Sequence, residues 1–361
     1  MAVGCGTHSY TITDREGGQV TAGGILTAVQ YNRVLNDFST AKATIAVTGA
    51  DCCAEQGQIR SWRHRLNVYR STGGADVLMW SGFITNVDWS FDQTVVSAVD
   101  IVGLLDRRVP HRAFTFSDTD ITEVARQLVE DALAPDDPGH TVSVIGPAGV
   151  YGGRTYEQNV GQSGDHLRDL ADTGLDFTAV GTNIVILPDQ FCDVVGRLGD
   201  EDLPEGLTVS EDGTSLGTRQ IVAGTEEGSV IGTAGGVNPY YGLLEIYTEQ
   251  TTISDQAAAD GAAEARLRSS LGVPVFIDTQ NVTLSPTANV DVAQLVPGWC
   301  VDITSNHTCR VITQRLKITG LDVAEDGGSE QTPGQERITL QVTTTGDDLE
   351  TSPLTAPLEG N

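Results

Sequence analysis

Hydrophobic and polar residues alternate along most of the first hundred positions, and this period of two predicts β-strands. The clearest run has one mostly apolar face made of alternate residues: Val77, Met79, Ser81, Phe83, Thr85, Val87, Trp89 and Phe91. Gly82 lies inside this run, where a bulge or a close approach of two backbones is expected. The next run, 94–102, is apolar on both faces, which predicts a central strand covered on both sides. With the runs at 8–13, 25–35, 41–47 and 65–70, these segments predict a small antiparallel barrel or sandwich.

The spacing of apolar residues changes after Pro110, where intervals of three and four predict helices. The first helical stripe consists of Ile121, Val124, Ala125, Leu128, Val129, Ala132 and Leu133. Asp120 and Glu123 match a variant of the capping box, and Pro135 is expected to end this helix. A second helix is predicted from Ser163 to Gly174. A strand at 141–146 and a hairpin at 175–187 complete an α+β segment.

The rest of the chain predicts loops, one helix and a second β region. Residues 196–237 are rich in glycine and acids, and are expected to form loops and edge strands. A helix is predicted at 254–272, capped by Ser254, ended by Gly272 and supported by an i,i+4 pair of Glu264 and Arg268. Alternating residues such as Ile338, Leu340 and Val342 predict strands again from Val273 onward.

These patterns predict a β-rich α+β protein with two small antiparallel β-barrel-like domains and an α+β insert. The expected first barrel covers 1–109, and residues 200–250 are a candidate to complete it. The insert covers 110–199, connecting strands and a helix cover 200–272, and the second barrel covers 273–345. Residues 346–361 are polar and contain proline, which is typical of a flexible tail.

The charge of the chain narrows the classes of partner. A formal net charge of −28 argues against specific nucleic-acid binding, which depends on cationic groups that displace counterions. The acids either keep the protein soluble or form a wall that repels passing DNA. Residues 1–6 lack the pattern of a signal peptide, and no apolar run approaches the roughly 20 residues of a membrane span. Synthesis in a cytoplasm and no membrane insertion are therefore expected.

No residues with the pattern of a catalytic, cofactor-binding or metal site emerge. Six cysteines lack zinc-ribbon spacing and are expected to be free and buried, although Cys300 and Cys309 could pair across two strands. Asp172-Thr173-Gly174 matches the aspartic protease tripeptide, but it occurs once and follows a helix, where a helix end is the better interpretation. His166 lies near a helix start without a nucleophile motif. The other histidines are expected in turns or at the surface: His8, His64, His111, His140 and His307.

The order of these segments resembles a known family. A β region ending in "WSGFI" (80–84) and "DIVGLLDRR" (100–108), then "LRDLADTGLDF" (167–177), then a helix and a closing β region, is similar to the tail-tip (baseplate) hub proteins of tailed bacteriophages. More narrowly, the chain resembles minor tail proteins of siphophages that infect actinobacteria, and this resemblance fits its low lysine content, since only 2 of its 21 basic residues are lysine. The resemblance covers roughly 25–345, and its motifs are structural rather than catalytic.

The resemblance implies a structural role in the virion, with synthesis in the host cytoplasm. Members form homotrimers in which two barrel-like domains per chain make a pseudo-six-fold ring. The implied partners are the distal tail protein, the tape-measure protein and other tail-tip or fibre proteins. DNA would pass through the ring during ejection, and a lumen made acidic by Asp88, Asp100 and Asp302 is expected. The chain ends soon after its last predicted strand, as a hub without an extension would.

Two alternative functions remain open. One is a cell-wall hydrolase or protease at the tail tip, which requires an active-site constellation. The other is a receptor-binding or carbohydrate-binding module, which requires exposed aromatic side chains beside a groove. Arg107 and Arg108 are unusual in so acidic a protein. They could pair with acidic groups of a neighbouring subunit, or they could pair within the chain or lie exposed to solvent.

Overall fold

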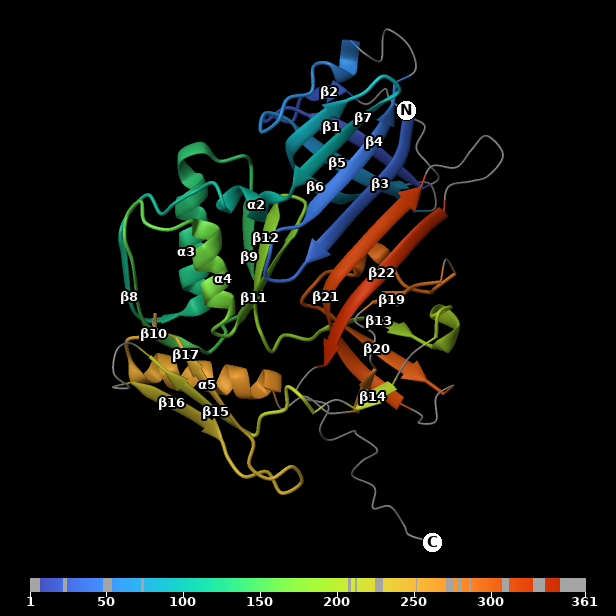
Figure 1. The fold of residues 1–361 in the computed structure, drawn as a ribbon. Coiled ribbons are helices and arrows are strands. Elements are labelled where there is room, and N and C mark those ends of the chain that lie inside the picture. The colour runs from blue at the N-terminus through green and yellow to red at the C-terminus, as the bar shows by residue number, and fades with distance from the viewer. Residues whose placement is uncertain are drawn as a thin grey trace.

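The computed structural model is a β-rich α+β fold with one large sheet and several small ones (Figure 1). It describes residues 7–21, 25–47, 54–72, 75–206, 209–211, 213–224, 230–250, 252–270, 275–277, 281–285, 287–306, 312–326 and 335–344. The expected tail at 346–361 lies outside these residues, as do Cys5, Cys52, Cys53, His307 and Cys309.

The large sheet has twelve strands and joins both ends of the sequence. Its main path runs in the order β13-β20-β21-β3-β4-β7-β6-β5-β1-β2, with β22 paired to β21 and β19 paired to β22. The N-terminal strands are β1 (His8–Thr13), β2 (Gln19–Thr21), β3 (Ile25–Val34), β4 (Thr40–Ala46), β5 (Arg65–Thr72), β6 (Ala75–Trp89) and β7 (Gln93–Val99). The later strands are β13 (Val194–Leu198), β19 (Val282–Thr283), β20 (Cys300–Ser305), β21 (Ile312–Asp326) and β22 (Gln335–Thr344). The antiparallel pair of β3 and β21 connects the two β regions.

The long apolar run predicted around Gly82 forms β6 as expected, and β7 lies centrally between β4 and β6. A Cβ atom on Gly82 would lie 2.2 Å from the backbone oxygen of Val99, so the expected close backbone approach is confirmed. The register of β6 shifts against both neighbouring strands, between Val68 and Tyr69 and between Ile84 and Asn86. These irregularities break the simple alternation, and the predicted apolar residues Trp89 and Phe91 are exposed.

The middle of the chain forms a separate group of helices and strands. It contains α2 (Ile101–Leu105), β8 (Phe114–Asp120), α3 (Ile121–Leu133), a 3-10 turn (Ala134–Asp136), β9 (Thr141–Val144), β10 (Tyr151–Tyr156), α4 (Ser163–Ala171), β11 (Leu175–Val180) and β12 (Asn183–Pro188). The helix predicted over the Leu128 stripe is confirmed, and the Asp120 side chain caps it by accepting from the Thr122 amide. The predicted hairpin is β11 paired with β12. The pairing of β8 with β10 had no clear signal in the sequence.

A third group combines β15 (Arg219–Ala223), β16 (Ile231–Gly235) and β17 (Glu245–Glu249) with α5 (Gln256–Ser270). Two short strands, β14 (Val209–Glu211) and β18 (Val275–Ile277), pair antiparallel, and 3-10 turns occur at Asp200–Asp202 and Val292–Gln294. The predicted cap of α5 was wrong by one residue, since Asp255 accepts from the Ala258 amide. The predicted partner of Arg268 was also wrong, because Arg268 lies 3.5 Å from Asp189.

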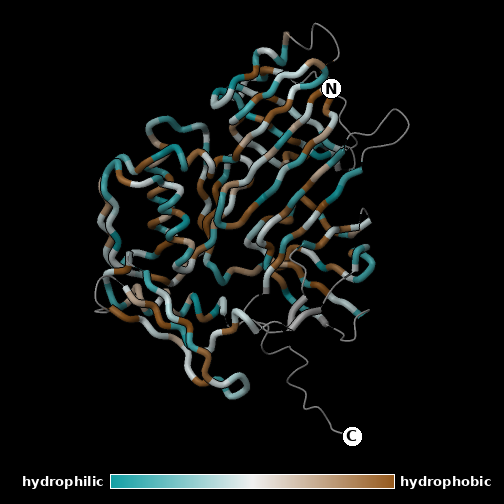
Figure 2. The backbone as a smooth tube through the Cα atoms, in the orientation of Figure 1, coloured by the Kyte–Doolittle hydropathy of each residue, from teal (hydrophilic) through white to brown (hydrophobic). Residues whose placement is uncertain are grey.

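Three hydrophobic cores hold these groups together. The largest runs under the whole twelve-stranded sheet and contains side chains from both β regions, including Tyr31 and Leu321. The second lies around α3 and also takes Phe83 from β6 and the buried residues of α2. The third is built mostly from alanines of α5 against its small sheet. Along the strands of the large sheet, hydrophobic and hydrophilic residues alternate (Figure 2).

Candidate functional site

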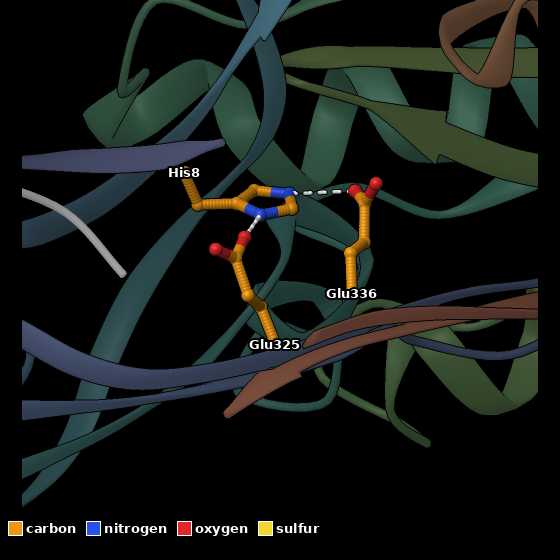
Figure 3. A group of neighbouring side chains, drawn as sticks. All are labelled: His8, Glu325 and Glu336. Carbon is orange, nitrogen blue, oxygen red and sulfur yellow. Dashed lines mark hydrogen bonds and ion pairs between the residues drawn. The ribbon is translucent and has the colours of Figure 1, made fainter. Parts of the chain in front are cut away.

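The structure brings together one buried group of ionisable side chains that the sequence analysis did not predict. His8 on β1 lies between Glu325 on β21 and Glu336 on β22 (Figure 3). The two glutamates are direct cross-strand partners in the β21–β22 ribbon. The His8 Nδ1 atom contacts the Glu325 carboxylate, and Nε2 lies 3.7 Å from Glu336 Oε1 and 3.2 Å from the Tyr31 hydroxyl. We call His8, Glu325, Glu336, Arg70 and Tyr31 the seam cluster.

The seam cluster joins strands that share no backbone ladder. β1 pairs with β2 and β5, whereas β21 pairs with β3, β20 and β22. The amide and hydroxyl of Thr7 also donate to Glu325, at 2.9 and 3.2 Å. Contacts of the glutamate side chains, and not a backbone ladder, therefore connect the N-terminal strand to the C-terminal ribbon.

Charges inside the seam cluster nearly cancel. Arg70 binds Glu336 with two hydrogen bonds of 2.7 and 2.8 Å, a bidentate geometry that is stronger than a single contact. This hydrogen bonding raises the pKa of Arg70, and burial raises that of Tyr31 above its usual range. Two carboxylates face one guanidinium and one imidazole, so a proton on His8 would make the group electrically neutral.

The seam cluster fits a metal ion poorly, although His8 and its two glutamates are potential ligands. One ligand atom of each side chain lies within 4.8 Å of the other two, but the two carboxylates lie against different nitrogens of the imidazole ring. Glu336 is already bound by Arg70, and Glu325 accepts from Thr7 and contacts His8. The arrangement is that of a structural ion-pair network.

The prediction that the histidines lie in turns or at the surface was wrong for His8, which lies in β1 and is 1% exposed, whereas His64 follows a turn at 61–63 and is 5% exposed. His8 has the inward parity of Tyr10 and Ile12, so the period of two contained the signal. Burial lowers the pKa of His64, whose Nδ1 atom accepts from the Arg60 amide at 3.2 Å. His166 is held by the carbonyl oxygen of Val160 at 3.0 Å.

The aspartic protease tripeptide ends a helix, as expected. Asp172 is the C-cap of α4, and the Thr173 hydroxyl donates to the Leu170 carbonyl at 2.8 Å. Arg154 donates to the same hydroxyl at 3.1 Å. These bonds give Thr173 a structural role.

The cysteines depart from the expectation of free thiols. Cys192 and Cys300 form a disulfide that closes a loop with a sequence separation of 108 residues. It joins the segment before β13 to β20, beside an edge-to-face contact of Phe191 and Trp299 with ring centres 5.3 Å apart. Closing so long a loop restricts the unfolded chain. Tertiary proximity produced this pair, for which spacing along the chain gives no signal.

Of the three aspartates that were expected to line a channel, Asp100 is buried and Asp302 is paired with an arginine. Asp100 is buried and caps α2, accepting from the amides of Gly103 at 3.1 Å and Ser39 at 2.8 Å. Burial raises its pKa to about 6. Asp302 pairs with Arg315 at 2.8 Å, whereas Asp88 is exposed on β6.

A shallow groove of about 310 Å³ crosses one face of the large sheet over β3, β4 and β7. Its lining combines polar side chains with apolar ones and includes one cation and one acid: Gln30, Tyr31, Asn32, Thr40, Ala41, Lys42, Thr85, Ser97, Ala98, Val99 and Asp322. Cross-strand pairing places Lys42 between Gln30 and Ser97. The lining therefore carries little net charge, in contrast to the chain as a whole.

The two unusual arginines have partners within the chain. Arg108 lies 3.1 Å from Asp136, and the guanidinium of Arg107 lies 5.3 Å from the centre of the Trp62 ring. An intrachain ion pair is observed for Arg108, whereas Arg107 is exposed, and its pairing with a neighbouring subunit stays a prediction. Within the described residues, no helix has both the length and the hydropathy needed to cross a membrane.

Solved structures of similar fold come from tail proteins. The 43 kDa tail protein of prophage MuSo2 from Shewanella oneidensis superposes with a TM-score of 0.63 and 12% identity, covering 94% of this chain and 99% of that one. The tail protein from Neisseria meningitidis MC58 gives 0.60 and 12%, covering 93% and 96%. Prophage tail protein gp18 from Listeria monocytogenes EGD-e gives 0.56 and 14%, covering 92% and 94%. No family model and no curated protein sequence matches the chain. At this identity the likeness shows a shared fold.

Proposed function

We propose that this chain is the structural hub of a phage tail tip, and more narrowly a minor tail protein of a siphophage that infects actinobacteria. The observation that carries the proposal is the length of the likeness, because the fold matches nearly the whole of this chain and of each tail protein. A match limited to one small sheet would carry little functional information.

The hub assembles as a homotrimer. Three chains, each with a β region at 1–109 and another at 273–345, supply six ring elements around an axis. The same division of the chain into domains assigns 110–199 to the insert and 200–272 to the connecting strands and helix. The direct pairing of β3 with β21 supports this geometry, because it holds the two β regions of one chain in a defined relation. The ring joins the end of the tail tube and the tape-measure protein to tip or fibre proteins.

The proposed passage of DNA through the hub does not require a channel lined with acidic residues. With Asp100 buried and Asp302 paired, the weakly charged sheet face at the groove is the better candidate for a channel wall. A wall with few cations offers little binding energy to phosphates, which is what a conduit requires. The role is structural rather than enzymatic.

The mass of the native protein tests the proposal. Native mass spectrometry and light scattering at micromolar concentration should give three times the chain mass of 38.2 kDa. Obligate interfaces of this kind commonly bury more than about 2,000 Å², so the trimer should persist on dilution. A monodisperse monomer, or six copies in each virion tail, would contradict the hub. A zymogram with cell-wall substrate tests the hydrolase alternative, and binding of the isolated protein to host cells tests the receptor-binding alternative.

A further inference from the structure

One part of the surface concentrates exposed apolar side chains. Six of the 15 exposed large hydrophobic residues among the described residues fall between positions 231 and 247. They are Ile231, Val237, Tyr240, Leu243, Leu244 and Tyr247, with exposed fractions from 39% to 75%. We call this group the arm patch. It lies on the small sheet of β15, β16 and β17 and on the hairpin between β16 and β17 (Figures 1 and 2).

One part of the arm patch is the face of the small sheet that α5 does not cover. A Cβ atom on Gly232 would collide with the backbone of Ala259, so α5 covers the face of β16 that Gly232 occupies. The neighbouring residue Ile231 must therefore point the other way. On the same outer face, Ile221 of β15 pairs directly with Tyr247 of β17. The outer face thus carries an aromatic and two aliphatic side chains with no helix over them.

The hairpin is fixed in shape before any contact is made. Asn238 and Gly242 exchange two backbone hydrogen bonds of 2.8 and 2.9 Å across its base. The Asn238 side chain accepts from the amides of Tyr240 and Tyr241, and the two tyrosine rings meet edge to face with centres 4.7 Å apart. A preorganised aromatic hairpin loses little conformational freedom on binding, which favours a tight contact.

The area of the arm patch suits a subunit interface. Aromatic side chains offer about 150–250 Å² each, so the six residues together expose on the order of 600 Å². That value is at the upper end of the largest patches on monomeric proteins, about 300–600 Å². With its polar rim it approaches the roughly 800 Å² that each partner contributes to a standard interface.

Charge points to a second copy of the chain as the occupant. Two molecules with a net charge of −28 repel one another wherever their acidic surfaces meet. At the arm patch, Arg219 and Glu245 form a 2.7 Å ion pair on neighbouring strands, which neutralises both groups locally. The Tyr247 hydroxyl donates to Glu249 at 3.3 Å, so this remaining acid of β17 is hydrogen-bonded. An acidic second copy of the chain can therefore approach the arm patch with less repulsion than it meets at an acidic surface.

We propose that the arm patch is a surface through which each chain contacts its neighbour in the homotrimer, in addition to the contacts between the ring elements. This inference rests on the hub function proposed above and adds the residues that make the assembly. In a three-fold ring the contact is heterologous, so the arm patch of each subunit binds a different surface of the next. Tyr240 and Val237, which are 70% and 75% exposed, are the side chains that become buried.

The experiment compares two variants of the full chain. Val237→Ser with Tyr240→Ser removes two exposed side chains and leaves the Asn238–Gly242 base of the hairpin in place. The matched control is Phe91→Ser, which removes a fully exposed aromatic residue at the turn between β6 and β7. Light scattering and native mass spectrometry follow the trimer over a dilution series. Circular dichroism confirms that both variants fold.

Loss of the Val237 and Tyr240 contacts should raise the dissociation constant of the trimer by at least about 30-fold. The dissociation constant of the control should match that of the wild type. Hydrogen exchange in 236–249 should slow in wild-type trimer and return to the dilute value in the arm variant. An arm variant that stays trimeric like the wild type would overturn this inference and leave the hub intact. Equal dissociation of the arm variant and the control would overturn it too. A wild-type monomer at every concentration would contradict both this inference and the hub.

Discussion

A buried ion pair between β21 and β11 should behave as a single energetic unit. Lys317 of β21 binds the carboxylate of Asp176 on β11, and the exposed fractions of the two side chains are only 8% and 9%. Lys317 also donates to the carbonyl oxygen of Asp189 at 2.5 Å, and Asn36 donates to Asp176 at 2.7 Å. The C-terminal β region and the middle of the chain therefore meet at this pair.

Replacing one partner leaves the other as an uncompensated buried charge. Lys317→Met and Asp176→Asn should each lower the free energy of unfolding by about 3–5 kcal/mol. The double variant has no buried charge, so it should lose much less than the sum of the two single losses. We expect a coupling energy of at least about 3 kcal/mol, which is large for neighbouring residues.

Urea unfolding of all four proteins, at one fixed chain concentration, measures this cycle, because the stability of an oligomer depends on concentration. Arg315→Met is the control on the same strand. Its partner is Asp302, and its side chain is 48% exposed, so the loss should stay below about 1 kcal/mol. Additive losses in the double variant, or single losses no larger than the control, would refute the argument that burial makes this pair strong.

Three further results are expected from single side chains. Leu128 is 2% exposed within α3, so Leu128→Asp buries an unpaired charge and should cost several kcal/mol in thermal unfolding, whereas Leu128→Met should cost less than about 1.5; equal melting of the two variants would contradict the packing. Gly82→Ala brings a Cβ atom 2.2 Å from the Val99 backbone oxygen and should destabilise by more than about 3 kcal/mol, and a near-neutral effect would show that the strands can separate. Burial raises the pKa of Asp100 from 3.8 to about 6, so the folded state binds the proton more tightly and this carboxyl stabilises it fully only below pH 3.8. That stability, about 3 kcal/mol, should be lost as the pH rises to about 6, and the difference in unfolding free energy between wild type and Asp100→Asn should follow it; a difference independent of pH would refute the assignment.

Local features of the fold could be predicted from the sequence. The helical stripe around Leu128 and its Asp120 cap depend on residues within four positions of each other, and both occur as expected. The close approach at Gly82 follows from one residue without a side chain inside an apolar strand. The helix end at Asp172 depends on the preceding turn alone. Each of these signals is local, because helical and strand periods extend over only a few residues.

The seam cluster and the disulfide could not be predicted in this way. His8 had the inward parity of its strand, yet its partners Glu325 and Glu336 lie more than 300 positions away. Asp100 was expected at a lumen because the apolar run was taken to continue as a strand, whereas the chain turns into α2 there. Phe91 was predicted on the apolar face of a strand, whereas it lies in the turn between β6 and β7 and is fully exposed.

The sequence by itself determined the class of the molecule: a β-rich chain with a helical insert, an acidic surface and no catalytic signature. Only the tertiary structure decided that β3 pairs with β21, which charges are buried, and that the hydrophobic residues near Tyr240 stay exposed. The physical reason is the range of the interactions. Periodicity and capping act between near neighbours, whereas strand order, charge burial and surface patches depend on which distant segments meet.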